Sequence, residues 1–404
     1  GFAHTSAWPL TGKHATQATC ESCHESGRYA EALRWAQLAE SMLRRVDADA
    51  EREAEALVTI ATVELHAGEY DAATERLERA LSLKAAASGA EDPDVAPIYA
   101  ALAKVHQERH QPARAEPLLE RALAILEANF GLEHPRCAEL LDKLGAVLGM
   151  QGRYAEAELH LRRALDIRER ALGRDHLLVG EILNNLGLVL SNQQLPEKRA
   201  EAEAIFTRAL GVIEASVGPG HPSLAYPLNS LGVLYLEEER CADALPLLER
   251  ALEINRRTLD REHKALAYPV LNIAACNATL ERHVEAVKGY REGLALLTRV
   301  TGENNGNVAR IHRDLGEELI ALERYEDAAD ELRRSLEVFD ALAEVRFADD
   351  RAEALFLSAV ALRGERPRAP EARREAKRRA REARDALSAE HPARAAIDAW
   401  LRER

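Results

Sequence analysis

The sequence contains few aromatic residues and no long apolar segment. Phe, Trp and Tyr make up only 4% of its 404 residues, a low share that is typical of Ala- and Leu-rich helical repeats rather than of mixed globular cores. No apolar run approaches the roughly 18 residues of a membrane-spanning helix. The formal net charge of −14 argues against a general nucleic-acid binder. The composition therefore predicts a helical protein with no membrane span and no nucleic-acid partner.

Signatures of catalysis are missing as well. The chain has no Gly-rich phosphate loop, no nucleophile elbow and no carboxylate pair at an informative spacing, so we do not expect an enzyme. Its five cysteines form no disulfide framework. Cys137, Cys241 and Cys276 are scattered, and we expect them to be small buried helix residues. A disulfide between two of them remains an alternative if the protein is exported.

One phrase recurs along most of the chain. It reads "GEYDAATERLERAL" from Gly68 and "GRYAEAELHLRRAL" from Gly152, and its later copies begin with Glu, as in "ERYEDAADELRRSL" from Glu323. The Ala of the closing Ala-Leu falls at Ala80, Ala122, Ala164, Ala209 and Ala251. These positions are 42 residues apart, except for one step of 45. A fixed period of this length predicts a stack of repeated units that share one continuous core.

A second phrase keeps the same step and marks the loop between units. It contains a His, at His134, His176, His221 and His263, which follows a Gly by three residues in the first three copies and Asp260 in the fourth. Gly is expected to end one helix and the His segment to start the next. We therefore expect the four His residues to be structural loop residues rather than metal ligands. Each unit then consists of two antiparallel helices, with small residues such as Ala157 and Ala164 where neighbouring helices approach closely.

These phrases resemble the tetratricopeptide repeat, in the 42-residue form of kinesin light chains. The resemblance implies an all-α, right-handed superhelical solenoid over residues 27–345, preceded by a short irregular segment, 1–26. Residues 346–404 would form a degenerate repeat and Arg-rich capping helices. It also implies a protein-interaction adaptor whose concave groove, lined by the first helix of each unit, binds a partner peptide.

The resemblance places several polar residues of the first helices in that groove. One column of the repeat holds Lys143, Asn185, Ser230, Asn272 and Asp314, and Asn184 and Asn229 precede two of them. The groove residues are predicted to be Lys143, Asn184, Asn185, Asn229 and Asn272. They would bond the backbone of an extended partner segment. The alternative is that they are solvated positions of amphipathic helices.

The N-terminal segment contains Cys20-Glu21-Ser22-Cys23-His24. A Cys-x-x-Cys-His sequence is the attachment signal of c-type haem, because two thiols bond the porphyrin edge and the adjacent His reaches the iron. With Phe2, His4, Pro9, Leu10, Gly12 and His14, the segment resembles a module of multihaem c-type cytochromes. The resemblance implies one haem c per chain, held covalently by Cys20 and Cys23. His24 would be the proximal iron ligand, and His14 or His4, of the same or a neighbouring chain, the distal one.

Two functions follow from the sequence. The first is an exported, periplasmic or extracellular bacterial electron-transfer protein that carries one haem on a repeat scaffold. Its partners would be redox proteins or neighbouring haem-bearing subunits of a homo-oligomer or filament. The second is the adaptor without a haem. A zinc site made of Cys20, Cys23, His24 and His14 and a non-functional relic remain as alternative interpretations of the motif.

The C-terminal end differs in charge from the rest of the chain. Residues 363–384 contain ten Lys or Arg and four Asp or Glu, a net charge of +6, which leaves −20 for the remainder. A basic helix here is expected either to be a solvated cap of the array or to contact the acidic surface of another subunit.

Overall fold

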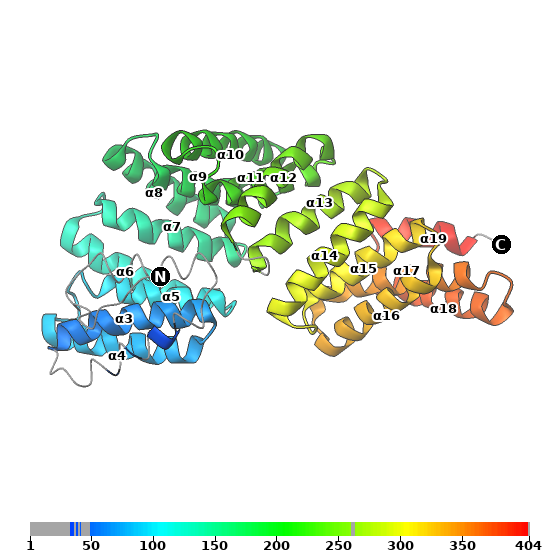
Figure 1. The fold of residues 1–404 in the computed structure, drawn as a ribbon, viewed down its shortest axis with the longest axis horizontal. Coiled ribbons are helices and arrows are strands. Elements are labelled where there is room, and N and C mark those ends of the chain that lie inside the picture. The colour runs from blue at the N-terminus through cyan, green and yellow to red at the C-terminus, as the bar shows by residue number, and fades with distance from the viewer. Residues whose placement is uncertain (1–32, 36–37, 39–40, 42–48, 260–262, 403–404) are drawn as a thin grey trace. The chain divides into compact units, whose positions relative to one another are not determined.

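The computed structural model describes residues 33–35, 38, 41, 49–259 and 263–402. The described residues form helices and connecting turns and group into two compact units, and each unit is a stack of helix pairs (Figure 1). The predicted all-helical repeat fold is therefore confirmed. The first unit takes in Gly1–Ser230 and Arg257–Asp260, and the second takes in Leu231–Arg256 and Arg261–Arg404.

The first unit contains four complete helix pairs. In each pair the two helices pack against each other, and the second helix packs against the first helix of the next pair. The bounds are α3 Ala50–Ala67, α4 Tyr70–Ser88, α5 Ala96–Glu108, α6 Pro112–Phe130, α7 Pro135–Met150, α8 Tyr154–Leu172, α9 Leu177–Ser191 and α10 Pro196–Val217. A short 3-10 turn, η1 Pro222–Leu224, leads into α11 Ala225–Glu237, within which the boundary between the units lies.

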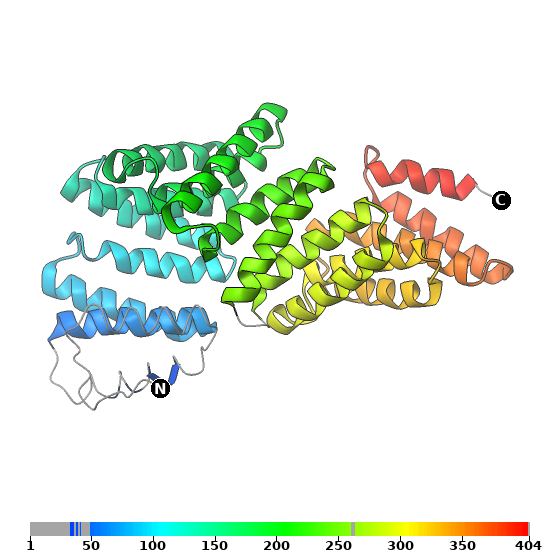
Figure 2. The same cartoon turned by 45° about the horizontal axis from the view of Figure 1, so that its top comes forward.

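The second unit continues the same pattern (Figure 2). Its helices are α12 Cys241–Thr258, α13 Ala267–Thr279, α14 His283–Thr301, α15 Gly306–Ala321, α16 Tyr325–Leu342, α17 Ala348–Glu365, α18 Pro370–Ala386 and α19 Pro392–Arg402, with 3-10 turns η2 Lys264–Leu266 and η3 Val345–Phe347. The last helix, α19, packs on α18. The predicted basic segment forms most of α18, whose buried face consists of Ala372, Ala376, Ala380 and Ala383.

Small residues allow close helix packing, as the sequence suggested. Ala157 and Ala164 are fully buried on α8. On the first helix α9, a Cβ atom at Gly187 would lie only 2.6 Å from Cε1 of Phe206, a fully buried ring on α10. The space that a side chain would fill at Gly187 is therefore occupied by the partner helix.

The recurring His residues begin helices. His134 is the N-cap of α7, and its Nδ1 accepts a hydrogen bond from the backbone N–H of Arg136 at 3.3 Å. His176 caps α9 in the same way, at 3.2 Å from the N–H of Leu178. Equivalent bonds form at His221, His263 and His391. The preceding helices end at Gly131 and Gly173, which have φ angles of 86° and 87°. The prediction that these His residues are structural loop residues is confirmed by these contacts.

Candidate partner-binding face of the first helices

Some first helices of successive pairs contact one another directly. Contacts join α3 with α5 and α7 with α9 in the first unit, and α15 with α17 in the second. We call the exposed surface of the first helices of each unit its first-helix face. The predicted groove residues lie on these helices, and the carboxylates around them prove equally important.

In the first unit, Asp142 on α7 accepts a hydrogen bond from Nδ2 of Asn185 on α9, at 2.9 Å. Burial raises the pKa of the Asp142 carboxyl above its ordinary value, although the bond from Asn185 lowers it in part. Burial, followed by the charge of Asp142, also raises the pKa of Glu181. Negative charge is thus costly on this part of the face, because two carboxylates lie close together in it.

The predicted groove residues do not all occupy the same environment. Lys143 pairs with Glu139 at 3.2 Å, one turn earlier on α7. Asn185 is partly buried and bonded to Asp142. Asn184 is only 8% exposed, and its Oδ1 has no hydrogen-bond partner among the described residues. Asn184 is therefore a buried polar residue, and the expectation that it lines the groove beside Asn185 needs this correction: its neighbour provides the accessible amide.

Asn229 on α11 and Asn272 on α13 are both partly buried. Large exposed aromatic residues lie one helical turn before the predicted column on these two helices. Tyr226 on α11 is 73% exposed, and Tyr268 on α13 is 56% exposed. Sequence reasoning missed both tyrosines, although each lies four residues before a column residue, at the spacing that brings two side chains onto one helix face.

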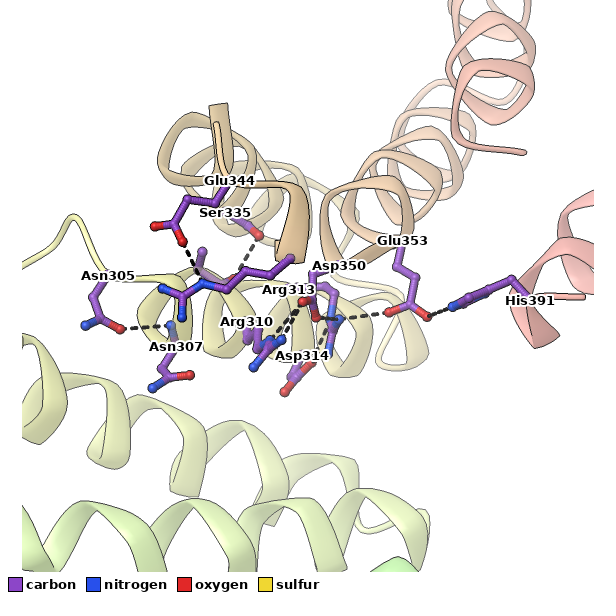
Figure 3. A network of polar contacts seen from close by, with 12 residues as sticks. Asn305, Asn307, Arg310, Arg313, Asp314, Ser335, Glu344, Asp350, Glu353 and His391 are labelled. Carbon is purple, nitrogen blue, oxygen red and sulfur yellow. Dashed lines mark hydrogen bonds and ion pairs between the residues drawn. The ribbon is translucent and has the colours of Figure 1, made fainter. Parts of the chain in front are cut away.

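In the second unit an ionic network lies on the first helices (Figure 3). Arg313 on α15 contacts Asp350 at 2.6 Å and Glu353 at 2.8 Å, both on α17. It also contacts its neighbour Asp314 at 2.9 Å. Arg310 adds a bond to Asp350 at 2.7 Å. At the far end of the network, Nε2 of His391 lies 4.0 Å from Glu353.

Carboxylates outnumber arginines in this network. Burial raises the pKa of Asp314, and the nearby Arg313 only partly offsets the effect. Burial, with the charges of Asp314 and Glu318, also raises the pKa of Glu317. The sequence signal for this cluster is an Arg-x-x-Arg-Asp run at Arg310–Asp314, but its carboxylate partners come from the next helix pair. Asp314 belongs to the column of polar residues noted in the sequence, whereas the network around it was not predicted.

The second helices also link neighbouring repeats through charged residues. Arg153 bonds Glu116 at 2.6 Å, Lys198 bonds Glu158 at 2.8 Å and Arg163 bonds Glu127 at 2.7 Å. Each of these pairs joins two successive repeats. The first helices α11 and α13 differ in that they expose Tyr226 and Tyr268, whose hydroxyls make no hydrogen bond in the described part of the chain.

The other predicted sites cannot be placed in the same way. Cys20, Cys23 and His24, with His4 and His14, lie outside the described residues. Within the described ranges, no group of three or more His, Cys, Asp or Glu residues is arranged to hold a metal ion. No helix among the residues described is long and apolar enough to cross a membrane. Cys137, Cys241 and Cys276 are free and buried.

Paired antiparallel helices with inter-repeat contacts define a helical-repeat scaffold. The chain belongs to the tetratricopeptide repeat family, whose pattern matches residues 52–128, 94–170, 136–198, 194–257 and 266–341. A comparison with curated protein sequences gives no match. Membership of this family supports a role as a protein-interaction scaffold.

Two solved structures of low sequence identity share the fold, and a third is similar over part of the chain. A Rap protein complexed with Competence and Sporulation Factor is 17% identical, with a TM-score of 0.57 over 76% of this chain and 80% of that chain. A Signal Transduction ATPase with Numerous Domains protein that has a tetratricopeptide repeat sensor, from Pyrococcus horikoshii, is 16% identical. Its TM-score is 0.56 over 88% of this chain and 50% of its own. BtubC (BKLC) from P. vanneervenii is 20% identical, with a TM-score of 0.45 over 63% of this chain and 94% of that chain.

Proposed function

We propose that the protein is an interaction adaptor whose first-helix face binds an extended segment of a partner protein. The observation that carries this proposal is the exposure of Tyr226 and Tyr268, at 73% and 56%, on helices that otherwise pack into the repeat core. Tyrosine offers a large apolar ring and a hydroxyl, and it is enriched among residues that dominate binding energy. The Rap structure, solved in complex with Competence and Sporulation Factor, is a precedent for a partner on this type of fold.

Asn185 and Lys143 would contribute polar contacts on the first-helix face of the first unit. The Asn185 amide has a second N–H in addition to the one it donates to Asp142, so it can still donate to a partner carbonyl. Lys143 is 37% exposed at its side chain and can reach a partner carboxylate or carbonyl. Asn229 and Asn272 are proposed to act with Tyr226 and Tyr268, which precede them on the same helices.

A peptide-selection experiment tests this function. Peptides selected from a displayed random library on the full chain are synthesised, and their affinities are measured by fluorescence anisotropy. Tyr226→Ala is expected to weaken binding at least tenfold, about 1.4 kcal/mol. Leu159→Ala is the matched control, because Leu159 is 70% exposed on the second helix α8. The proposal is wrong if the control weakens binding as much as Tyr226→Ala, or if no peptide is selected.

The Cys-x-x-Cys-His sequence supports a second function for residues 1–26. We propose that Cys20 and Cys23 bind one haem c, with His24 as the proximal ligand and His14 or His4 as the distal ligand. The protein would then be exported and would exchange electrons with redox partners or with haem-bearing subunits of a homo-oligomer or filament. A bound haem would supply one-electron transfer, and the repeat array would position it.

Absorption spectroscopy separates the two functions. The full chain is produced in a host that matures c-type cytochromes and is assayed as a pyridine haemochrome. One haem per chain is expected, and it should be lost in the Cys20→Ser, Cys23→Ser double variant. A colourless protein would leave the adaptor function alone, and zinc analysis of that sample would test the remaining metal site.

A further inference from the structure

In two repeats the first residue of a second helix is brought together with a residue of the next first helix, 35 positions later. In the repeat that begins the first unit, these residues are Tyr70 and Val105, which pack in one apolar cluster. In the second unit they are His283 and Glu318, where Nδ1 of the His lies 2.8 Å from Oε2 of the Glu. The two repeats thus place different residue types at the same pair of positions.

Two cysteines occupy the same pair of positions one repeat earlier in the second unit. Cys241 precedes His283 by 42 residues, and Cys276 precedes Glu318 by 42 residues. Cys241 is 1% exposed and Cys276 is fully buried, and both belong to one core cluster with Ala244 and Leu248. The buried cluster and the 42-residue register thus bring two small thiols to one place in the core. Other repeats have an aromatic ring or a hydrogen-bonded His–Glu pair at these positions.

We propose that Cys241 and Cys276 are a disulfide site that covalently joins α12 to α13 under oxidising conditions. The oxidant would be a small disulfide of the oxidised glutathione class. One protein thiolate attacks it, forms a mixed disulfide and releases one small thiol. The second protein thiol loses its proton, attacks the mixed disulfide and releases the second small thiol. Two protein thiols are oxidised and one small disulfide is reduced to two thiols, so atoms and electrons balance.

Burial sets the conditions under which the bond forms. Burial, followed by the hydrogen bond from Cys241, raises the pKa of the Cys276 thiol to about 12. Because the thiolate is the attacking species, the folded protein reacts slowly. The bond therefore closes while the chain folds, or when the junction between α12 and α13 opens locally. Once closed, it is protected by the same burial.

Peptide mapping tests the proposal on the full chain. The reduced protein is incubated with a mixture of oxidised and reduced glutathione in two arms, one native and one unfolded in urea and then refolded by dilution. Free thiols are alkylated in urea, and trypsin is added. Cleavage after Arg240, Arg250, Lys264 and Arg282 separates the two cysteines onto peptides 241–250 and 265–282. We expect these two peptides to be joined in the refolding arm, and more slowly in the native arm.

Cys137 is the internal control, because it is buried on peptide 137–143 and its Sγ donates a hydrogen bond to the carbonyl of Gly131, at 3.7 Å. It should be fully alkylated. In Cys276→Val, which installs the residue found at Val105, the 241–250 peptide should be alkylated or carry glutathione. The proposal is overturned if both peptides remain fully alkylated in the two wild-type arms, or if Cys241 is joined to any cysteine other than Cys276.

Discussion

Arg313 on α15 binds Asp350 on α17 at 2.6 Å, and the two side chains are only 18% and 14% exposed. The pair joins the first helices of successive repeats. Since Arg313 also contacts Asp314 and Glu353, a single guanidinium holds three carboxylates together. The stability of this part of the second unit therefore depends more on Arg313 than on any single one of these carboxylates.

Without Arg313, the three carboxylates that it binds should repel one another. Arg313→Ala is expected to lower the free energy of unfolding by about 2–4 kcal/mol at pH 7, because it leaves mostly buried carboxylates without their main counterion. The loss should shrink as the pH falls, because burial raises the pKa of Asp314 and this carboxylate is then neutralised first. Urea denaturation at several pH values measures it. Arg333→Ala is the control, since Arg333 is 57% exposed and its loss should cost under about 0.5 kcal/mol.

Glu158 on α8 should make the free energy of unfolding of the array depend on pH. Burial alone would raise the pKa of this carboxyl, but hydrogen bonds, the largest from Lys198, lower it from its ordinary value of 4.5 to about 2. A depressed pKa stabilises the folded state above the unfolded value and loses this contribution as the pH falls from about 4.5 to about 2. Glu158→Gln should remove roughly 3 kcal/mol at pH 7 and almost nothing at pH 2.

The measurement is the unfolding free energy of the two proteins between pH 2 and 7. Glu120→Gln, at an exposed position of the second helix α6, provides the comparison. A constant difference between wild type and Glu158→Gln across this range would contradict the ion-pair explanation.

Asp142→Asn should stabilise the fold at pH 7, whereas Glu158→Gln should destabilise it. Because burial raises the pKa of Asp142, its ionised form weakens the fold as the pH rises above the unfolded value of 3.8. An Asn at this position still offers Oδ1 to the amide of Asn185. The variant should therefore unfold at a higher temperature than wild type at pH 7, and the two should converge near pH 3. A lower melting temperature at pH 7 would show that the charge of Asp142 supports the fold.

Two glycines on neighbouring helices should respond in opposite directions. Gly187→Ala on α9 would place a methyl group 2.6 Å from the ring of Phe206, and this overpacking should cost about 1–3 kcal/mol. Gly211→Ala on α10 meets open space and should stabilise by about 0.5–1 kcal/mol, because Ala favours the helix. Thermal denaturation distinguishes the two. A loss of stability in both would mean that Gly211 is also packed against a neighbour.

The repeat was predictable because its signals are local. Periodic Ala and Leu, the Gly that ends a helix and the His that begins one lie within a few residues of the features they specify. The contents of the first-helix face were less predictable. Asn184 and Asn185 are adjacent in sequence, but one is buried and the other is partly exposed. The environment of Asn185 depends on Asp142, 43 positions away on the first helix of the preceding repeat. A column of polar residues in the sequence does not reveal that packing.

The same reason explains why Cys241 and Cys276 looked unrelated in sequence. Their contact becomes visible only when the repeat is aligned through His283 and Glu318, where the structure supplies a distance. The ionic network around Arg313 was not predicted for the same reason, because Asp350 and Glu353 lie after the last copy of the recurring phrase.

The histidines that begin helices place the same acceptor atom at several boundaries between repeats. An Nδ1 atom can accept a backbone N–H because it carries a lone pair in the tautomer whose proton lies on Nε2. His134, His176, His221, His263 and His391 all make this bond. One hydrogen-bond geometry therefore recurs along the chain, so a side chain that replaces any of these residues must offer an acceptor to the backbone N–H two positions later.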